Sequence, residues 1–166
     1  KATKPNTWKD AIAAAEYLIA QRYAGAKTLG IFGGSAGGIF VGRSITERPD
    51  LFAAAVPAVG VMDGPRFEFA SNGAANIPEF GTVKIEKEFR ALLAMSTLHA
   101  IRDGTPYPGI LFEHGVNDIR VPVSESLKAA ARFQQATTSG RPKSSARARA
   151  CTSPQLSTAR ISRCIQ

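Results

Sequence analysis

The spacing of apolar residues predicts alternating helices and strands over most of the chain. An amphipathic helix begins near Thr7, the predicted capping residue, and its apolar face is formed by Trp8, Ile12, Ala15, Leu18 and Ile19. Short apolar runs over 28–32 and 51–59 predict buried parallel strands, separated by a helix over 39–46. After a long loop over 60–80, the pattern predicts a helix over 84–95, a strand over 110–113 and a helix over 124–135. This alternation predicts an α/β fold with a parallel sheet.

The pattern is lost after Gly140. Residues 141–166 contain six basic residues, no acidic ones and both cysteines, whereas residues 1–140 contain 15 basic and 13 acidic residues. The net charge of +8 is therefore mainly a property of the tail. We predict a catalytic-type domain over 1–140 and a basic Ser/Arg-rich tail over 141–166 that is either disordered or read in a shifted frame. Neither the cysteines nor the charge indicates a cellular compartment.

A glycine-rich turn follows the first predicted strand. Residues 33–37 read Gly-Gly-Ser-Ala-Gly and match G-x-S-x-G, the nucleophile elbow of α/β-hydrolases. The elbow places Ser35 on a tight strand-to-helix turn, where the backbone N–H of Ala36 can stabilise an oxyanion. The alternative is a tight connection without chemistry. The order of strand, turn and helix favours the catalytic interpretation.

An aspartate follows the third predicted strand, as a serine triad requires. Asp118 comes after the strand over 110–113, which satisfies the chain order Ser, Asp, His of α/β-hydrolases. On spacing alone, a purely structural role for Asp118 in a turn is equally compatible with the sequence.

Five blocks resemble the catalytic domain of the prolyl oligopeptidase family over about residues 7–140. They match in order, and they are Ala14–Ile19, Gly33–Gly38, Arg48–Ala55, Val59–Asp63 and Asn117–Val121. The resemblance implies a partial α/β-hydrolase fold, the C-terminal part of the parallel sheet with flanking helices. It also implies a serine peptidase that cuts short peptides, often after proline, with a β-propeller in the upstream part of the full-length protein.

The resemblance assigns roles to individual residues. Ser35 matches the nucleophile, Asp118 the triad acid and Arg120 an arginine that contacts the substrate backbone. Val61 and Val121 match the apolar lining of the proline pocket, although either is equally compatible with ordinary core packing. Where the family carries a tryptophan and a tyrosine against the substrate proline, this chain has Asn76 and Phe80, which weakens strict proline specificity.

The base of the triad has no counterpart in the sequence. In the family it lies within a Gly-His-Gly-like motif expected near 150–160, where this chain has no histidine. The two histidines, His99 and His114, lie before the acid. Our hypothesis for the loss is a shifted reading frame, because some of the codons allowed for residues 156–159, read two bases later, can spell Glu-His-Gly. Without a base, Ser35 is a poor nucleophile.

Other readings are compatible with parts of the sequence. The same fold supports an esterase or an acyl-peptide hydrolase, and a non-catalytic protein with a polyanion-binding tail is the alternative outside the enzymes. The tail lacks the aromatic residues and helical pattern of nucleic-acid and membrane-surface binders. No metal-ligand spacing or phosphate-binding loop occurs, so we expect no metal and no cofactor.

Overall fold

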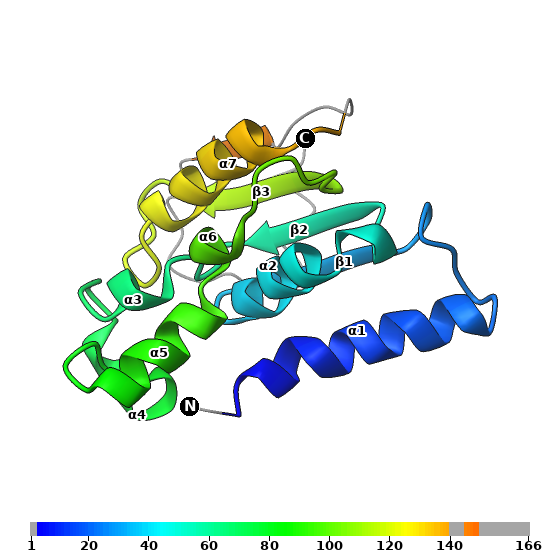
Figure 1. Cartoon of the computed structure of the whole chain (residues 1–166). Coiled ribbons are helices and arrows are strands. Elements are labelled where there is room, and N and C mark those ends of the chain that lie inside the picture. The colour runs from blue at the N-terminus through cyan, green and yellow to red at the C-terminus, as the bar shows by residue number, and fades with distance from the viewer. Residues whose placement is uncertain (1–2, 140–144, 150–166) are drawn as a thin grey trace.

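The computed structural model describes residues 3–139 and 145–149. Four parallel strands form one sheet in the order β1-β2-β3-β4 (Figure 1). They are β1 (Gly30–Gly34), β2 (Ala54–Ala58), β3 (Gly109–Gly115) and β4 (Ser145–Arg149). Since parallel strands end at the same edge of a sheet, the segments after β1, β2 and β3 lie next to one another.

Helices connect the strands. The longer ones are α1 (Pro5–Ala20), α2 (Gly37–Glu47), α5 (Glu86–Met95) and α7 (Ser124–Ala136). Single helical turns are α3 (Gly64–Phe67), α4 (Ile77–Phe80), α6 (Thr97–Ala100), η1 (Pro49–Leu51) and η2 (Ala74–Asn76). Helix α2 packs on β1 and β2, α7 packs on β3 and β4, and α6 contacts both helices.

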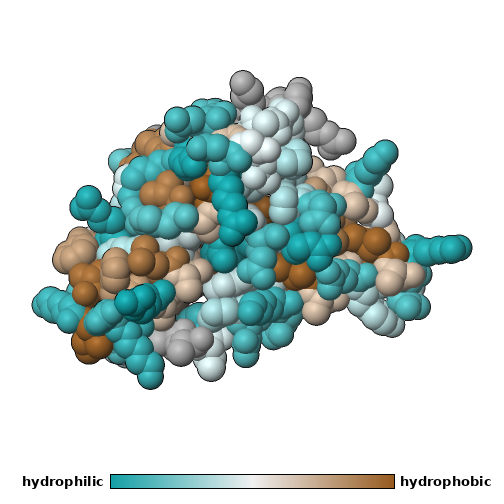
Figure 2. Space-filling view, viewed as in Figure 1, coloured by the Kyte–Doolittle hydropathy of each residue, from teal (hydrophilic) through white to brown (hydrophobic). Residues whose placement is uncertain are grey.

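One face of the sheet carries the core. Ile31, Ala55 and Ile110 are register partners on β1, β2 and β3, and all three are buried. They belong to one apolar cluster with residues of α2 and α7, among them Val41, Ile45, Ala129 and Phe133. The alternate positions face the other way, and Phe32 there is 59% exposed. Figure 2 shows further apolar surface between the polar patches of the molecule.

Element boundaries differ from the sequence expectations where local chemistry decides them. Helix α1 begins at Pro5, because proline suits the first helical position, so Thr7 lies inside the helix and makes no capping hydrogen bond. Leu18 is exposed rather than on the buried face. The strand predicted over 51–59 is shorter, because η1 takes Leu51, and the predicted loop over 60–80 contains α3, η2 and α4.

Strand β4 lies within the segment after residue 140 in which no regular element was predicted. Its backbone pairs with β3, from Leu111 opposite Ser145 to Gly115 opposite Arg149. The rest of the predicted tail lies outside the described residues. The division into a domain over 1–140 and a tail over 141–166 stays a prediction.

A buried carboxylate holds the segment after β2. Oε2 of Glu125, on α7, accepts the backbone N–H groups of Met62 at 2.8 Å and Asp63 at 2.6 Å. Asp63 is itself buried and pairs with Lys128 of the same helix. Burial raises the pKa of the Glu125 carboxyl from its ordinary value of 4.5, and the two N–H groups and Lys128 partly oppose this rise. Glu125 thus fixes α7 to the β2 end of the sheet edge.

A methyl group added at Gly38 tests the contact between α2 and the segment after β2. The Cβ of Gly38→Ala would lie 2.4 Å from the Gly60 Cα and 2.8 Å from the Val61 N. Both are backbone atoms, which cannot move aside as the end of a flexible side chain can. We expect a loss of about 1–3 kcal/mol in the free energy of unfolding, measured by urea titration with Trp8 fluorescence. Gly37→Ala is the matched control, because its Cβ meets nothing within 4 Å. Equal losses in both variants would contradict the close approach.

The raised pKa of Glu125 predicts a pH dependence of stability. A carboxyl whose pKa is higher in the folded state contributes stability that is fully present below pH 4.5 and is lost as the pH rises through the folded-state pKa. The unfolding free energy of the wild type should therefore fall relative to Glu125→Gln as the pH rises, by about 1.4 kcal/mol for each unit of upward shift. Glu86→Gln, an exposed carboxylate on α5, is the control. A difference between wild type and Glu125→Gln that does not change with pH would refute this assignment.

Candidate active site

Ser35 occupies a strained turn between β1 and α2. Its φ of 56° lies in the left-handed region that residues other than glycine rarely adopt. Its N–H donates to the Ala58 carbonyl at 3.0 Å, and its carbonyl accepts the N–H of Val61 at 3.0 Å and that of Gly38 at 2.9 Å. The end of β2 therefore holds the turn in place, and the serine is exposed. This is the geometry expected of a nucleophile elbow.

The flanking glycines allow α2 to lie close to β1. A Cβ at Gly33 would lie 2.6 Å from the Gly37 carbonyl oxygen and 3.0 Å from a methyl group of Val41. Any larger residue at Gly33 would push α2 away from the strand. Gly33, the first glycine of the motif, is thus required by packing as well as by the motif.

The N–H of Ala36 is available at the start of α2. Ala36 is exposed and caps the helix, and none of the described residues accepts a hydrogen bond from its N–H. The partial positive charge of a helix N-terminus adds to this donor. The position suits the predicted oxyanion role.

Asp118 lies at the same edge of the sheet, on the loop after β3. Its Oδ1 accepts the N–H groups of Arg120 at 2.8 Å and Val121 at 3.0 Å, so the carboxylate does stabilise a turn. Its Oδ2 has no hydrogen-bond partner among the residues described. Only β2 separates β1 from β3, which corresponds to two strand spacings of about 4.8 Å each. The free oxygen leaves Asp118 able to hold a further donor.

His114, on β3, holds the Asp118 loop in place from the buried side. The imidazole is 4% exposed, its Nδ1 lies 2.7 Å from the Ser126 hydroxyl, and its Nε2 lies 2.9 Å from the Val121 carbonyl. Because a carbonyl only accepts, Nε2 carries the proton and Nδ1 accepts from the serine. Both ring nitrogens are therefore occupied in holding β3, the loop and α7 together.

His99 lies elsewhere, on α6. It is exposed, and its Nδ1 is 2.8 Å from the Ser96 hydroxyl. It borders a cavity beside the C-terminal half of α2, whereas Ser35 precedes the first turn of that helix.

The predicted substrate-binding residues divide into two groups. Val61 and Val121 are both buried in the core cluster. The backbone N–H of Val61 donates to the Ser35 carbonyl, and that of Val121 donates to the Asp118 carboxylate. Arg120 is exposed on the Asp118 loop. The Ser71 hydroxyl donates to the Ile119 carbonyl and ties the segment before η2 to the same loop.

Asn76 and Phe80 lie on η2 and α4. Asn76 donates its side-chain amide to the Asn72 carbonyl at 2.7 Å. Phe80 is buried edge-to-face against Phe67, with centroids 6.1 Å apart, and Lys4 lies over its ring. Here Phe80 packs in the core and Asn76 stabilises its own helical turn.

Three features of this edge carried no sequence signal that we recognised. Val59 has a φ of 43°, an outlier for a β-branched residue, and its N–H donates to the Glu113 carbonyl at 2.7 Å. The roles of Glu125 and His114 in holding this edge depend on their burial. The type and position of a polar residue, in the first turn of α7 or near the end of β3, do not reveal that burial in the sequence.

Two kinds of feature are absent from the part of the chain that the structure describes. Residues 3–139 and 145–149 contain no group of three metal-ligating side chains, and within the same ranges no helix combines the length and apolarity of a membrane span.

Comparisons with known proteins agree with this geometry. The model of the prolyl oligopeptidase family matches residues 1–147. A prolyl endopeptidase of Dictyostelium discoideum is 36% identical over 135 residues, which are 81% of this chain and 18% of that protein. A dual function macrocyclase-peptidase of Galerina marginata is 38% identical over 133 residues, 80% of this chain and 18% of that protein.

Solved structures show the same similarity in three dimensions. Prolyl oligopeptidase B from Galerina marginata superimposes with a TM-score of 0.82 at 34% identity, over 88% of this chain and 21% of that one. Oligopeptidase B from Leishmania major gives a TM-score of 0.82 at 28% identity, over 87% and 20%. The chain thus spans about a fifth of the length of these relatives. The fold is a partial α/β-hydrolase fold, and the chain belongs to the prolyl oligopeptidase family.

Proposed function

We propose that this chain is part of the catalytic domain of a serine peptidase that hydrolyses short peptides through an acyl-enzyme on Ser35. Asp118 orients the base, the Ala36 N–H binds the oxyanion, and Arg120 contacts the substrate backbone. Val61, Val121, Asn76 and Phe80 shape the pocket for the residue before the cut bond; the two valines and Phe80 do so through their backbone and packing. An esterase or acyl-peptide hydrolase on the same fold is the alternative.

The left-handed Ser35 turn is the observation that carries the proposal. A strained conformation in a residue other than glycine persists only when the surrounding structure enforces it, and such strain concentrates at functional sites. Here the strain is enforced by hydrogen bonds to Ala58 and Val61, and it leaves the serine exposed. Turns without chemistry more often have glycine, asparagine or aspartate in this conformation.

Spacing in a relative supports the roles of serine and aspartate. Structures of prolyl oligopeptidase B from Galerina marginata carry alanine in place of a serine, an aspartate or a histidine. The substituted serine and aspartate are separated by the same number of residues as Ser35 and Asp118, to within one. Counted from Asp118, the histidine of that protein falls within residues 150–166, where this chain has none.

We infer that the chain as given lacks its general base. His114 uses both ring nitrogens in the core, and His99 lies at the far end of α2. Acylation requires that the Ser35 proton passes to a base as Oγ attacks the carbonyl carbon, and that the base returns it to the leaving amine. Without that transfer, oxyanion stabilisation alone supplies a residual acceleration of about 10³–10⁴-fold over water.

The proposed active enzyme includes a preceding part of the same protein. Parallel sheets are normally covered on both faces, yet Phe32 is largely exposed and its neighbours Val56 and Leu111 are half-buried. Among the described strands, β1 also pairs on one side only. Upstream strands and helices, with a β-propeller that restricts access to short peptides, would complete the fold.

The nucleotide sequence downstream of the Asp118 codon tests the missing base. We expect a frame two bases out of phase to encode an apolar strand followed by Glu-His-Gly at the codons of residues 156–159. In a chain carrying that end, a fluorophosphonate probe should phosphonylate Ser35, with loss of fluoride, at least about 10³-fold faster than in the chain as given, and Ser35→Ala should abolish the label in both. Third codon positions that cannot encode Glu-His-Gly in the shifted frame would refute the frame shift. Equal labelling of the two chains would refute the requirement for a histidine base.

A further inference from the structure

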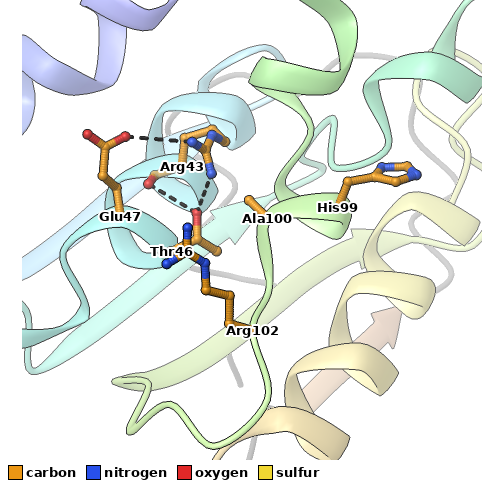
Figure 3. A pocket seen from close by; sticks show the side chains of 6 residues that line it. All are labelled: Arg43, Thr46, Glu47, His99, Ala100 and Arg102. Carbon is orange, nitrogen blue, oxygen red and sulfur yellow. Dashed lines mark hydrogen bonds and ion pairs between the residues drawn. The ribbon is translucent and has the colours of Figure 1, made fainter. Parts of the chain in front are cut away.

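A cavity lies beside the C-terminal half of α2, at the opposite end of that helix from Ser35 (Figure 3). Its volume is about 360 Å³, within the range of small-ligand pockets. The lining residues come from α2 and from α6 with the segment that follows it, and they are Arg43, Thr46, Glu47, His99, Ala100 and Arg102.

Arg43 is a buried cation with unused donors. Its side chain is 15% exposed, and its guanidinium lies over the Trp8 ring at 4.9 Å from the centroid. One terminal nitrogen donates to the Thr46 hydroxyl at 2.9 Å, whereas Nε is buried without a hydrogen-bond partner in the described structure. A guanidinium offers five N–H donors, so most of its capacity is unfilled.

The nearby carboxylate compensates this charge only partly. Glu47 Oε2 lies 3.6 Å from the other terminal nitrogen of Arg43, and it accepts the indole N–H of Trp8 at 2.7 Å. The stronger interaction of Glu47 is therefore with Trp8. The net charge of the residues that line the cavity is positive.

Arg102 adds a second positive charge. It is exposed and forms no ion pair with any of the described residues. Arg102 lines the same cavity as Thr46, to which Arg43 donates, and Figure 3 shows the His99 ring pointing away from both arginines. Burial is the largest effect on the Arg43 guanidinium and lowers its pKa. The negative charge of Glu47 opposes this decrease, and the positive charge of Arg102 adds to it. Two like charges that line one cavity and act on each other electrostatically favour a counter-anion between them.

We propose that this cavity binds a small oxyanion, a phosphate or carboxylate group, between Arg43 and Arg102. Guanidinium groups match the geometry of both anions through paired N–H donors. The site is separate from Ser35 and does not depend on the peptidase activity. Bound anion would relieve the repulsion between the two arginines and fill unused donors of Arg43.

Trp8 provides a built-in reporter, because it is the only tryptophan of the chain and stacks on Arg43. The test is a titration of the 166-residue chain with inorganic phosphate and, separately, sodium acetate, at constant ionic strength held with NaCl. Trp8 fluorescence and the Arg43 Nε–Hε resonance are followed. We expect saturable changes in both signals with a Kd on the order of 1 mM, as two charge-assisted hydrogen bonds allow. A response to phosphate alone would indicate that the site binds phosphoryl groups. A response to both phosphate and acetate would indicate a site for oxyanions in general.

Charge-matched variants separate this site from the basic tail. Arg102→Gln removes an exposed side chain and should weaken binding at least about tenfold. Arg90→Gln, on the exposed face of α5, removes the same charge and should leave the Kd unchanged. Signals that rise without saturation, or that respond equally in the two variants, would overturn the proposal.

Discussion

The left-handed turn at Ser35 is the constraint on which the rest of the structure depends. Its hydrogen bonds to Ala58 and Val61 join the end of β1 to the end of β2, and the glycine pair Gly38 and Gly60 lets α2 lie against that junction. If α2 moved outward by the width of a methyl group, the turn would lose its partners. The strained conformation of Ser35 therefore depends on the sheet edge and on the position of α2, and none of the three can change without the others.

The remainder of the edge is fixed by buried polar groups rather than by apolar contacts alone. Glu125 binds the segment after β2, and His114 binds the loop that carries Asp118. Both side chains connect to α7, since Glu125 belongs to that helix and His114 bonds to Ser126 within it. Such satisfied networks rigidify the groups they join. Helix α7 thus supports the loop that carries Asp118 and the segment that holds the Ser35 turn.

The sequence predicted the features that local pattern determines. Alternating apolar segments indicated the parallel sheet, and the glycines around Ser35 indicated the elbow, both in agreement with the structure. Tertiary contacts determined the rest: the start of α1 at Pro5, the helical turns within 60–80, the strained Val59 and the burial of Glu125. Strand β4 gave no apolar pattern, because its backbone pairing with β3 does not require one. The cavity at Arg43 was missed because its arginines lie 59 positions apart in the chain.

The central claim is that Ser35 and Asp118 form a catalytic pair whose general base is missing from the chain as given. Adding free imidazole to the chain as given tests this most directly, because imidazole is a general base that can take the Ser35 proton in place of the missing histidine. The account predicts that imidazole accelerates the covalent labelling of Ser35 by a fluorophosphonate, as located by peptide mass spectrometry, and that Asp118→Asn weakens this acceleration. Labelling of Ser35 that is independent of imidazole and of Asp118 would contradict the account.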